Sequence, residues 1–192
     1  MEAQSEDRQV EPDVVASVTH NPYSGKHGIE HATPQEFFDR INRVWRFTLD
    51  VCATRDNHKV NRFFCPPEAH TGTPGVNTPG YFDSFCGSAG IDGLSQDWHE
   101  DVCWMNPPFA RGKLVKWVQK AVTESRRGAV VIALLPAGID TVWFHTLVAP
   151  NARVINVDGR IKFVGSTSGA KTPNIIAEFL PPEYGSAKAQ IK

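Results

Sequence analysis

The stretch Val102-Cys103-Trp104-Met105-Asn106-Pro107-Pro108-Phe109 is an apolar run that ends at two prolines and an aromatic ring. Apolar residues before such a breaker are typical of a buried strand. Neither Pro107 nor Pro108 can donate a backbone hydrogen bond, so the strand should end there, and Pro107 favours an extended Asn106. We therefore expect the Asn106 amide and nearby carbonyls to lie at a strand tip beside Phe109. Acceptors next to a flat ring suit a planar group bearing an amine, such as a nucleobase.

The flanking segments alternate between helical and strand patterns. Thr33-Pro34-Gln35-Glu36 predicts a helix start, with Thr33 as the capping residue, and an apolar stripe continues to about residue 45. A second helix is predicted over about 114–125, and the continuous apolar run 128–136 predicts a central strand. The remaining patterns predict a short helix near 143–148 and strands at 47–53, 153–157, 161–164 and 174–179. This order predicts an α/β protein with a mostly parallel sheet and a late antiparallel strand.

Length and composition predict one globular domain. The chain has 192 residues, of which 41% are hydrophobic and 21% charged. We expect a flexible N-terminal tail over 1–29, a domain over 30–182 with a long irregular loop at 68–91, and a C-terminal tail over 183–192. No apolar run approaches ~18 residues, so no membrane span is expected. The acidic, polar N-terminus does not resemble a secretory signal.

Charge and cysteine usage narrow the possible partners. The net charge of -1 provides no global basic field, so a nucleic acid would have to be held by a local patch. The four cysteines at 52, 65, 86 and 103 contain no CxxC pair, and no metal site is predicted. We expect reduced thiols and a cytosolic setting.

Polar residues fall near the ends of the predicted strands, where open α/β sheets bind their ligands. They are Asp50, Asp97 and Asn106. A buried Asp50 needs a reason, and capping the next turn or contacting a ligand are equally good ones. The lysines of the 114–125 helix are interpreted as a solvated face rather than a nucleic-acid contact, and His145 as a packing residue.

Asn106-Pro107-Pro108-Phe109 matches the [DNS]-P-P-[YFW] signature of amino-methyltransferases that use S-adenosylmethionine. The chain also resembles the phage-type DNA N6-adenine methyltransferase (Dam-like) family in order over about residues 30–180. Further segments carry this resemblance: Thr33-Pro34-Gln35-Glu36-Phe37-Phe38, Leu49-Asp50-Val51-Cys52-Ala53, Asp92-Gly93-Leu94-Ser95-Gln96-Asp97-Trp98, Lys116-Trp117-Val118, Leu134-Leu135-Pro136-Ala137, Asp140-Thr141 with Trp143-Phe144-His145, and Gly159-Arg160-Ile161-Lys162-Phe163.

The resemblance implies a Rossmann-like, S-adenosylmethionine-dependent methyltransferase fold and methyl transfer to the N6 amine of a flipped-out adenine in double-stranded DNA. It places catalysis on Asn106, Pro107, Pro108 and Phe109. The Asn106 side-chain oxygen and the Pro107 carbonyl would accept the two N–H bonds of the amine, while Phe109 stacks on the base. Such catalysis works by positioning and local electrostatics, so no metal is required. A phage-encoded enzyme of this family would act in the cytoplasm of a bacterial host.

The resemblance also implies binding residues. Thr33 and Pro34 would lie beside the methionine end of the cofactor, and the expected cofactor contacts are Thr33, Pro34, Asp50, Cys52, Asp97, Trp98 and Asn106. Asp50 and Cys52 occupy the first cofactor motif, which here lacks the usual glycines, and Asp97 would recognise the adenine end. Expected contacts to DNA phosphates are Arg111, Lys113, Arg160, Lys162 and Lys171.

Two kinds of alternative remain open at this point. The same signature serves cytosine N4, RNA adenine and protein glutamine methyltransferases, because each acceptor is a planar amine. A catalytically inactive nucleic-acid-binding module is the alternative outside enzymes, although an intact Asn106 and Phe109 argue against it. The sequence carries no signal for an oligomeric state.

Overall fold

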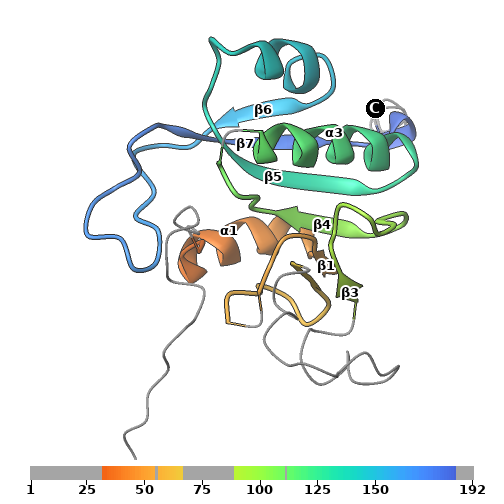
Figure 1. Ribbon diagram of the computed structural model, residues 1–192, viewed down its shortest axis with the longest axis horizontal. Coiled ribbons are helices and arrows are strands. Elements are labelled where there is room, and N and C mark those ends of the chain that lie inside the picture. Colours follow the sequence, from red (N-terminus) through yellow and green to blue (C-terminus); the bar gives the residue numbers. More distant parts are fainter. Residues whose placement is uncertain (1–31, 55, 67–88, 111, 185–192) are drawn as a thin grey trace, which may run out of the picture.

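The computed structural model describes residues 32–54, 56–66, 89–110 and 112–184, and Figure 1 shows their arrangement. The predicted N-terminal tail, residues 185–192 of the predicted C-terminal tail and most of the predicted loop at 68–91 lie outside these residues. Residues 183 and 184, predicted as the start of that tail, instead end a short helical turn. The helices are α1 (Gln35–Trp45), α3 (Lys113–Arg126) and the short π-helix η2 (Phe144–Val148). The strands are β1 (Leu49–Asp50), β2 (Phe64–Cys65), β3 (Gly90–Ile91), β4 (Val102–Met105), β5 (Val130–Pro136), β6 (Arg153–Asn156) and β7 (Asn174–Phe179).

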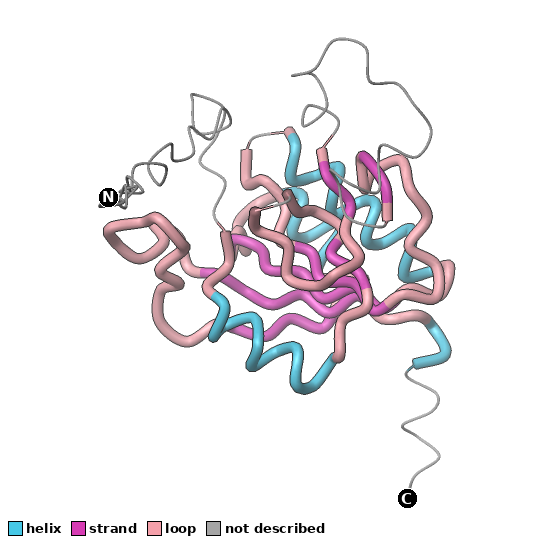
Figure 2. Tube along the Cα trace, turned by 90° about the horizontal axis from the view of Figure 1, so that it is seen from below, coloured by secondary structure: helices cyan, strands magenta, loops and turns pink. Residues whose placement is uncertain are grey.

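Five strands form the main sheet, in the order β1-β4-β5-β7-β6. The β1, β4 and β5 strands are parallel, and β7 runs antiparallel to its neighbours β5 and β6. The strands form a twisted central layer in Figure 2. A small parallel pair, β2 and β3, forms a separate sheet next to β1, to which an isolated bridge between Asp50 and Phe63 connects it. These pairings confirm a mostly parallel α/β sheet with one late antiparallel strand, and β5 is the buried central strand that its apolar run predicts.

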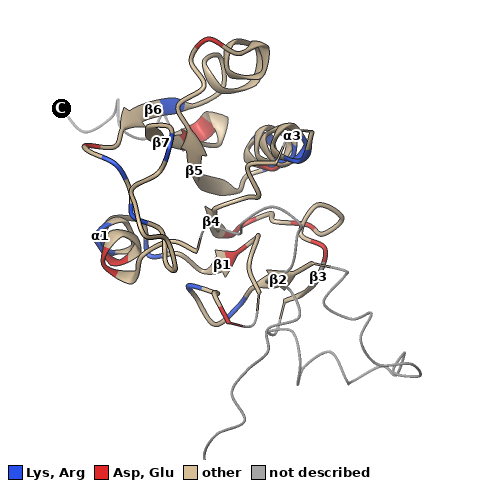
Figure 3. Ribbon diagram, turned by 60° about the vertical axis from the view of Figure 1, so that its left-hand side comes forward, with Lys and Arg blue, Asp and Glu red and all other residues tan. Residues whose placement is uncertain are grey.

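The two faces of the sheet bury different side chains because residues alternate along a strand. On one face, Cys103 and Met105 of β4 pack in a core with Val118 and Ala121 of α3. On the other, Trp104 packs in a second core with Phe38 of α1, at 5.4 Å between ring centroids. Figure 3 shows α1 and α3 on opposite sides of the sheet.

Helix α1 begins one residue later than its capping pattern predicts. The capping residue is Pro34, and Thr33 makes no capping hydrogen bond. The Thr33 hydroxyl is instead buried, with no hydrogen-bond partner among the residues that the structure describes. The prediction of Thr33 as the cap is therefore wrong, because Pro34 keeps an extended backbone (ψ 138°) and the helix begins only at Gln35.

Two strand predictions also need correction. The strand predicted over 47–53 is reduced to Leu49–Asp50, because residues 51–54 leave the sheet and line a pocket. Residues 161–164 form no strand. Ile161 and Phe163 are buried and Lys162 is exposed, because the first two side chains extend from a loop into the core on the α1 side of the sheet. Alternation alone cannot distinguish a strand from such a loop.

Two further observations bear on earlier expectations. Cys65 takes part in a disulfide bond, so the prediction that all the thiols are reduced is wrong. Within the described ranges, no helix combines the length and apolar character that crossing a membrane requires.

Candidate active site

A pocket of about 270 Å³ lies at the carboxyl ends of β1 and β4. Its walls come from the turn after β1, the end of β2, the turn after β3, the segment after β4 and the first turns of α3. The lining residues are Val51, Cys52, Ala53, Thr54, Asn57, Phe64, Cys65, Pro66, Asp92, Gly93, Leu94, Asn106, Pro107, Pro108, Lys113, Lys116 and Trp117. We call it the first pocket.

Asp50 shapes the turn that forms one wall of the first pocket but is not among the residues lining it. Its carboxylate is 2% exposed and accepts hydrogen bonds from the backbone N–H groups of Cys52 (3.3 Å) and Lys59 (3.0 Å). Burial raises the pKa of Asp50 to about 7, and the two backbone hydrogen bonds act in the opposite direction. Of the two roles expected for Asp50, this geometry favours that of organising the turn.

Another wall of the first pocket is made by Asp92, Gly93 and Leu94. Asp92 has a positive φ of 53°, and its side chain accepts a hydrogen bond from the N–H of Leu94 at 3.3 Å. A Cβ on Gly93 would lie 2.2 Å from the carbonyl oxygen of Val51 and 3.1 Å from the ring of Trp117. Only glycine allows the turn to approach β1 this closely, and the approach puts Asp92 in the pocket lining.

Asp97 and Trp98 do not line the first pocket. Asp97 is exposed, pairs with Arg127 at 2.9 Å and accepts a hydrogen bond from the N–H of His99. These contacts, that of His99 first, lower the pKa of Asp97. Trp98 is fully buried, and its indole N–H donates to the Gly93 carbonyl at 2.8 Å. Trp98 therefore anchors the Asp92–Gly93 wall through the Gly93 carbonyl, whereas the contacts of Asp97 are with His99 and Arg127.

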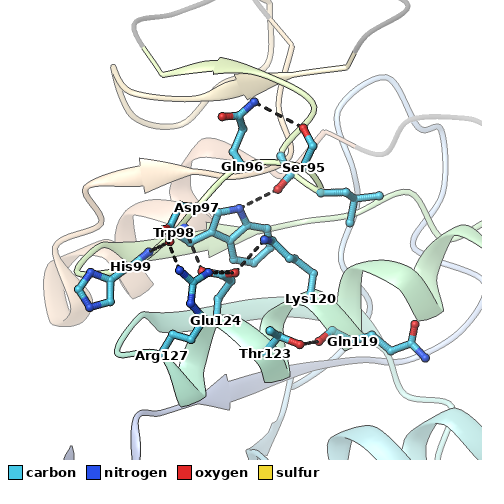
Figure 4. A network of polar contacts seen from close by, with 12 residues as sticks. Ser95, Gln96, Asp97, Trp98, His99, Gln119, Lys120, Thr123, Glu124 and Arg127 are labelled. Atoms are coloured by element: carbon cyan, nitrogen blue, oxygen red, sulfur yellow. Dashed lines mark hydrogen bonds and ion pairs between the residues drawn. The ribbon is translucent and has the colours of Figure 1, made fainter.

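A buried carboxylate on α3 fastens this segment in place (Figure 4). Glu124 is 0% exposed and accepts a hydrogen bond from the N–H of Trp98 at 3.0 Å. Its other oxygen contacts Lys120 at 2.8 Å and Arg127 at 3.0 Å. Buried charge is tolerated when it is paired and hydrogen-bonded in this way.

A second pocket, of about 410 Å³, begins where the first one ends along the chain. Asn106, Pro107 and Pro108 line the first pocket, while Phe109 lines the second and meets Phe163 edge-on at 6.3 Å. The second pocket is completed by Ala110, Gly112, Leu114, Val115, Pro136, Ala137, Gly138, Asp140, Thr141, Trp143, Thr172 and Pro173. The segment from Asn106 to Phe109 therefore contributes to both cavities.

The remaining predicted residues are scattered. Thr33 and Pro34 line neither pocket, and Arg111 lies outside the described residues. Lys113, expected on DNA, lines the first pocket with Lys116.

The predicted cations of the 157–173 loop have two different placements. The Arg160 guanidinium donates to the carbonyls of Ala170 (3.3 Å) and Lys171 (2.7 Å), which closes the loop between β6 and β7. Lys162 and Lys171 are exposed on that loop.

Sequence reasoning missed several lining residues, chiefly Asn57, Phe64, Asp92, Gly93 and Trp117. For Asp92 a signal was present, because Asp-Gly is a turn dipeptide and here follows a short apolar segment. The sequence analysis assigned the cofactor contact to Asp97 instead, because Asp97 lies nearer the strand that follows. No group of three or more His, Cys, Asp or Glu side chains that suits a metal ion occurs among the described residues.

A mostly parallel sheet with pockets at its carboxyl edge places the chain among the α/β proteins that bind ligands beyond their strand ends. Comparison with known proteins is more specific. The family model described as "DNA N-6-adenine-methyltransferase (Dam)" matches residues 85–179. A protein of Haemophilus phage HP1 (strain HP1c1) named DNA N-6-adenine-methyltransferase is 29% identical over 168 residues, covering 82% of this chain and 83% of that protein. Both matches agree with the resemblance to the DNA N-6-adenine-methyltransferase (Dam) family that the sequence motifs carry.

Proposed function

We propose that this protein transfers a methyl group from S-adenosylmethionine to the N6 amine of an adenine in DNA. The family description and the name of the phage relative both support this reaction. The structural observation that carries the proposal is the position of the Asn106–Phe109 segment. It contributes Asn106 to one pocket and Phe109 to a neighbouring one, as a transfer between two bound molecules requires. The reversed β7 beside parallel strands supports a Rossmann-like methyltransferase fold.

The first pocket suits the methyl donor. S-adenosylmethionine supplies an activated methyl group on a sulfonium, and it carries a purine, a ribose and an amino acid. Asp92 offers a carboxylate that can accept hydrogen bonds from hydroxyl or amino groups, beside the apolar rings of Phe64 and Trp117. Lys113 and Lys116, in the first turns of α3, offer positive charge to a carboxylate. These residues therefore offer partners for the hydroxyl and amino groups, the purine ring and the carboxylate of this cofactor.

The second pocket suits the base that accepts the methyl group. An exocyclic amine is a poor nucleophile, because its lone pair is delocalised into the ring. The Asn106 side-chain oxygen and the Pro107 carbonyl would accept its two N–H bonds and favour a tetrahedral nitrogen with a directed lone pair. Phe109 would stack on the base and hold it in line. An adenine inside a duplex cannot reach this segment, so the proposal includes flipping of the base out of double-stranded DNA.

The main test replaces Asn106 with alanine. Asn106→Ala should lower kcat by about 10²-fold or more, since one preorganised polar group is worth that much in comparable sites. Binding of S-adenosylmethionine should change little. The measurements are transfer of labelled methyl to unmethylated genomic DNA, followed by digestion to nucleosides, and titration of the cofactor.

Asn61→Ala is the matched control, because Asn61 is exposed and lines neither pocket. Wild-type turnover by Asn106→Ala would refute the mechanism. Label recovered on cytosine, RNA or protein instead of adenine would refute the proposed acceptor. Failure of the wild-type chain to bind the cofactor would favour the inactive nucleic-acid-binding alternative.

A second test separates the two candidate acids. Asp92→Asn should raise the dissociation constant of S-adenosylmethionine by about 10-fold, which corresponds to one hydrogen bond to a charged group. Asp97→Asn removes only an exposed ion pair and should leave that constant nearly unchanged. A larger rise in this dissociation constant for Asp97→Asn than for Asp92→Asn would instead indicate that Asp97 contacts the cofactor, as the sequence motif predicts.

A further inference from the structure

The turn between β5 and η2 exposes large apolar side chains to water. Ile139 is 62% exposed and Val142 is 79% exposed. Their turn also forms one wall of the second pocket, through Gly138, Asp140 and Thr141. Two exposed apolar side chains thus stand beside the cavity proposed to receive the adenine.

Local hydrogen bonds fix the shape of this turn. The N–H of Thr141 donates to the Gly138 carbonyl at 2.9 Å, and the Thr141 hydroxyl donates to the same oxygen. Gly138 is packed closely, since a Cβ there would lie 2.9 Å from the ring of Trp143. Because the turn is already ordered, burying the exposed Ile139 side chain against a partner would cost little additional conformational entropy.

The loop between β6 and β7 also borders the second pocket, through Thr172 and Pro173. The N–H of Ala137 donates to the carbonyl of Pro173 at 2.9 Å, which joins the Ile139 turn to the loop between β6 and β7. That loop exposes Lys162 and Lys171. Asp140 is the one acid of residues 137–149, and it would keep the turn itself away from phosphates. The cavity therefore has an apolar flank, which suits stacked bases, and a basic flank, which suits the backbone.

We propose that Ile139, supported by Val142, acts as a wedge that enters the DNA base stack where the adenine leaves it. This inference rests on the proposed function, because it assumes that an adenine enters the second pocket. Flipping a base out leaves an apolar gap between the neighbouring base pairs. An apolar side chain that fills the gap loses its own contact with water and keeps the flipped base from returning.

The test compares one DNA in two forms. The double variant Ile139→Ala/Val142→Ala should lose at least 10-fold in the ratio of kcat/KM on native genomic DNA to kcat/KM on the same DNA after heat denaturation. Denatured DNA has no stack to open, so activity on it should persist. Ile139→Leu should restore the ratio. Val44→Ala is the control, because Val44 is 75% exposed on α1 and lines neither pocket.

Two results would overturn the wedge. One is an unchanged ratio in the double variant, and the other is an equal loss on both forms of DNA, which would assign the turn to the pocket instead. A second measurement applies even where denatured DNA is a poor substrate. It uses a duplex in which 2-aminopurine replaces an adenine that the wild-type protein methylates. The fluorescence of 2-aminopurine rises when the base unstacks. At saturating protein the double variant should give less than half the wild-type rise, and an equal rise overturns the proposal.

Failure of the proposed function looks different from failure of the wedge. If the proposed function is wrong, the wild-type chain will methylate adenine in neither form of the DNA. A chain that methylates adenine while the double variant keeps the wild-type ratio would instead disprove only the wedge.

Discussion

At the scale of single residues, the carboxylate of Asp50 contributes to the first pocket indirectly. It is buried at the end of β1 and holds the turn that carries Cys52 through two backbone N–H groups. Burial raises its pKa to about 7 from an ordinary value of 3.8. The turn is thus organised by a group whose charge changes near neutral pH.

This pKa predicts a pH-dependent stability. The folded protein holds the Asp50 proton at a higher pH than the unfolded chain does, so the stabilisation is complete below pH 4 and is lost as the pH rises to about 7. Asp50→Asn stays neutral at every pH. Between pH 5 and pH 7.5, wild type should therefore lose about 2–3 kcal/mol in its free energy of unfolding relative to Asp50→Asn, as measured by urea denaturation.

Asp97→Asn is the control for this experiment. The pKa of Asp97 is lowered in the folded protein, so its contribution is present at neutral pH and is lost as the pH falls. That loss occurs only below about pH 4, so the difference in free energy of unfolding between wild type and Asp97→Asn should stay constant between pH 5 and pH 7.5. A constant difference between wild type and Asp50→Asn across the range would contradict the assignment.

At the scale of elements, α3 both supports the sheet and positions the wall of the first pocket. Val118 and Ala121 face the core, and Lys113 and Lys116 reach the pocket from its first turns. Glu124, near its end, holds Trp98, which in turn donates to Gly93. One helix therefore connects a buried charge cluster to the proposed cofactor site.

Removing the charge of Glu124 should affect both stability and cofactor binding. Glu124→Gln leaves Lys120 and Arg127 without their buried counter-charge, and the free energy of unfolding should fall by about 2–4 kcal/mol. Loosening of Trp98 should also raise the dissociation constant of S-adenosylmethionine, while kcat at saturation stays near wild type. Thermal melting and cofactor titration measure these effects. Glu36→Gln, at an exposed site on α1, should change neither quantity. Wild-type stability and cofactor affinity in Glu124→Gln would disprove the proposed connection between Glu124 and the first pocket.

At the scale of the whole molecule, the chain has a net charge of -1 and so lacks a general attraction for DNA. Binding must then depend on a few local cations. The loop between β6 and β7, whose Thr172 and Pro173 line the second pocket, exposes Lys162 and Lys171. Arg160 closes that loop through the Ala170 and Lys171 carbonyls.

Affinity for DNA should accordingly show a shallow dependence on salt. Lys162→Ala and Lys171→Ala should each reduce the slope of log K against log [KCl] by about 0.9, the value for one lost phosphate contact. Fluorescence anisotropy at several KCl concentrations measures the slope. Arg43→Ala, exposed in the last turn of α1, should leave it unchanged. Equal slopes in all the variants would place the phosphate contacts elsewhere.

Local patterns in the sequence were enough for the elements of the fold. The prolines at 107 and 108 end β4, and helical periodicity predicts α1 and α3 to within a few residues. The apolar run at 128–136 predicts β5, which spans Val130–Pro136. These features depend on backbone preferences and burial that act over one or two turns of chain. The motif at 106–109 likewise indicated the proposed chemistry, because its residue types and order carry it.

Only the tertiary structure decided which acid reaches the first pocket. Asp92 lies there because Gly93 lets its turn approach Val51, while Asp97 is drawn to Arg127 and Trp98 to Glu124. Each of these partners is about 25 or more residues away in the sequence, and no local pattern reports such a contact. The same holds for the division of the 106–109 motif between two pockets, because their walls come from segments that meet only when the sheet has formed.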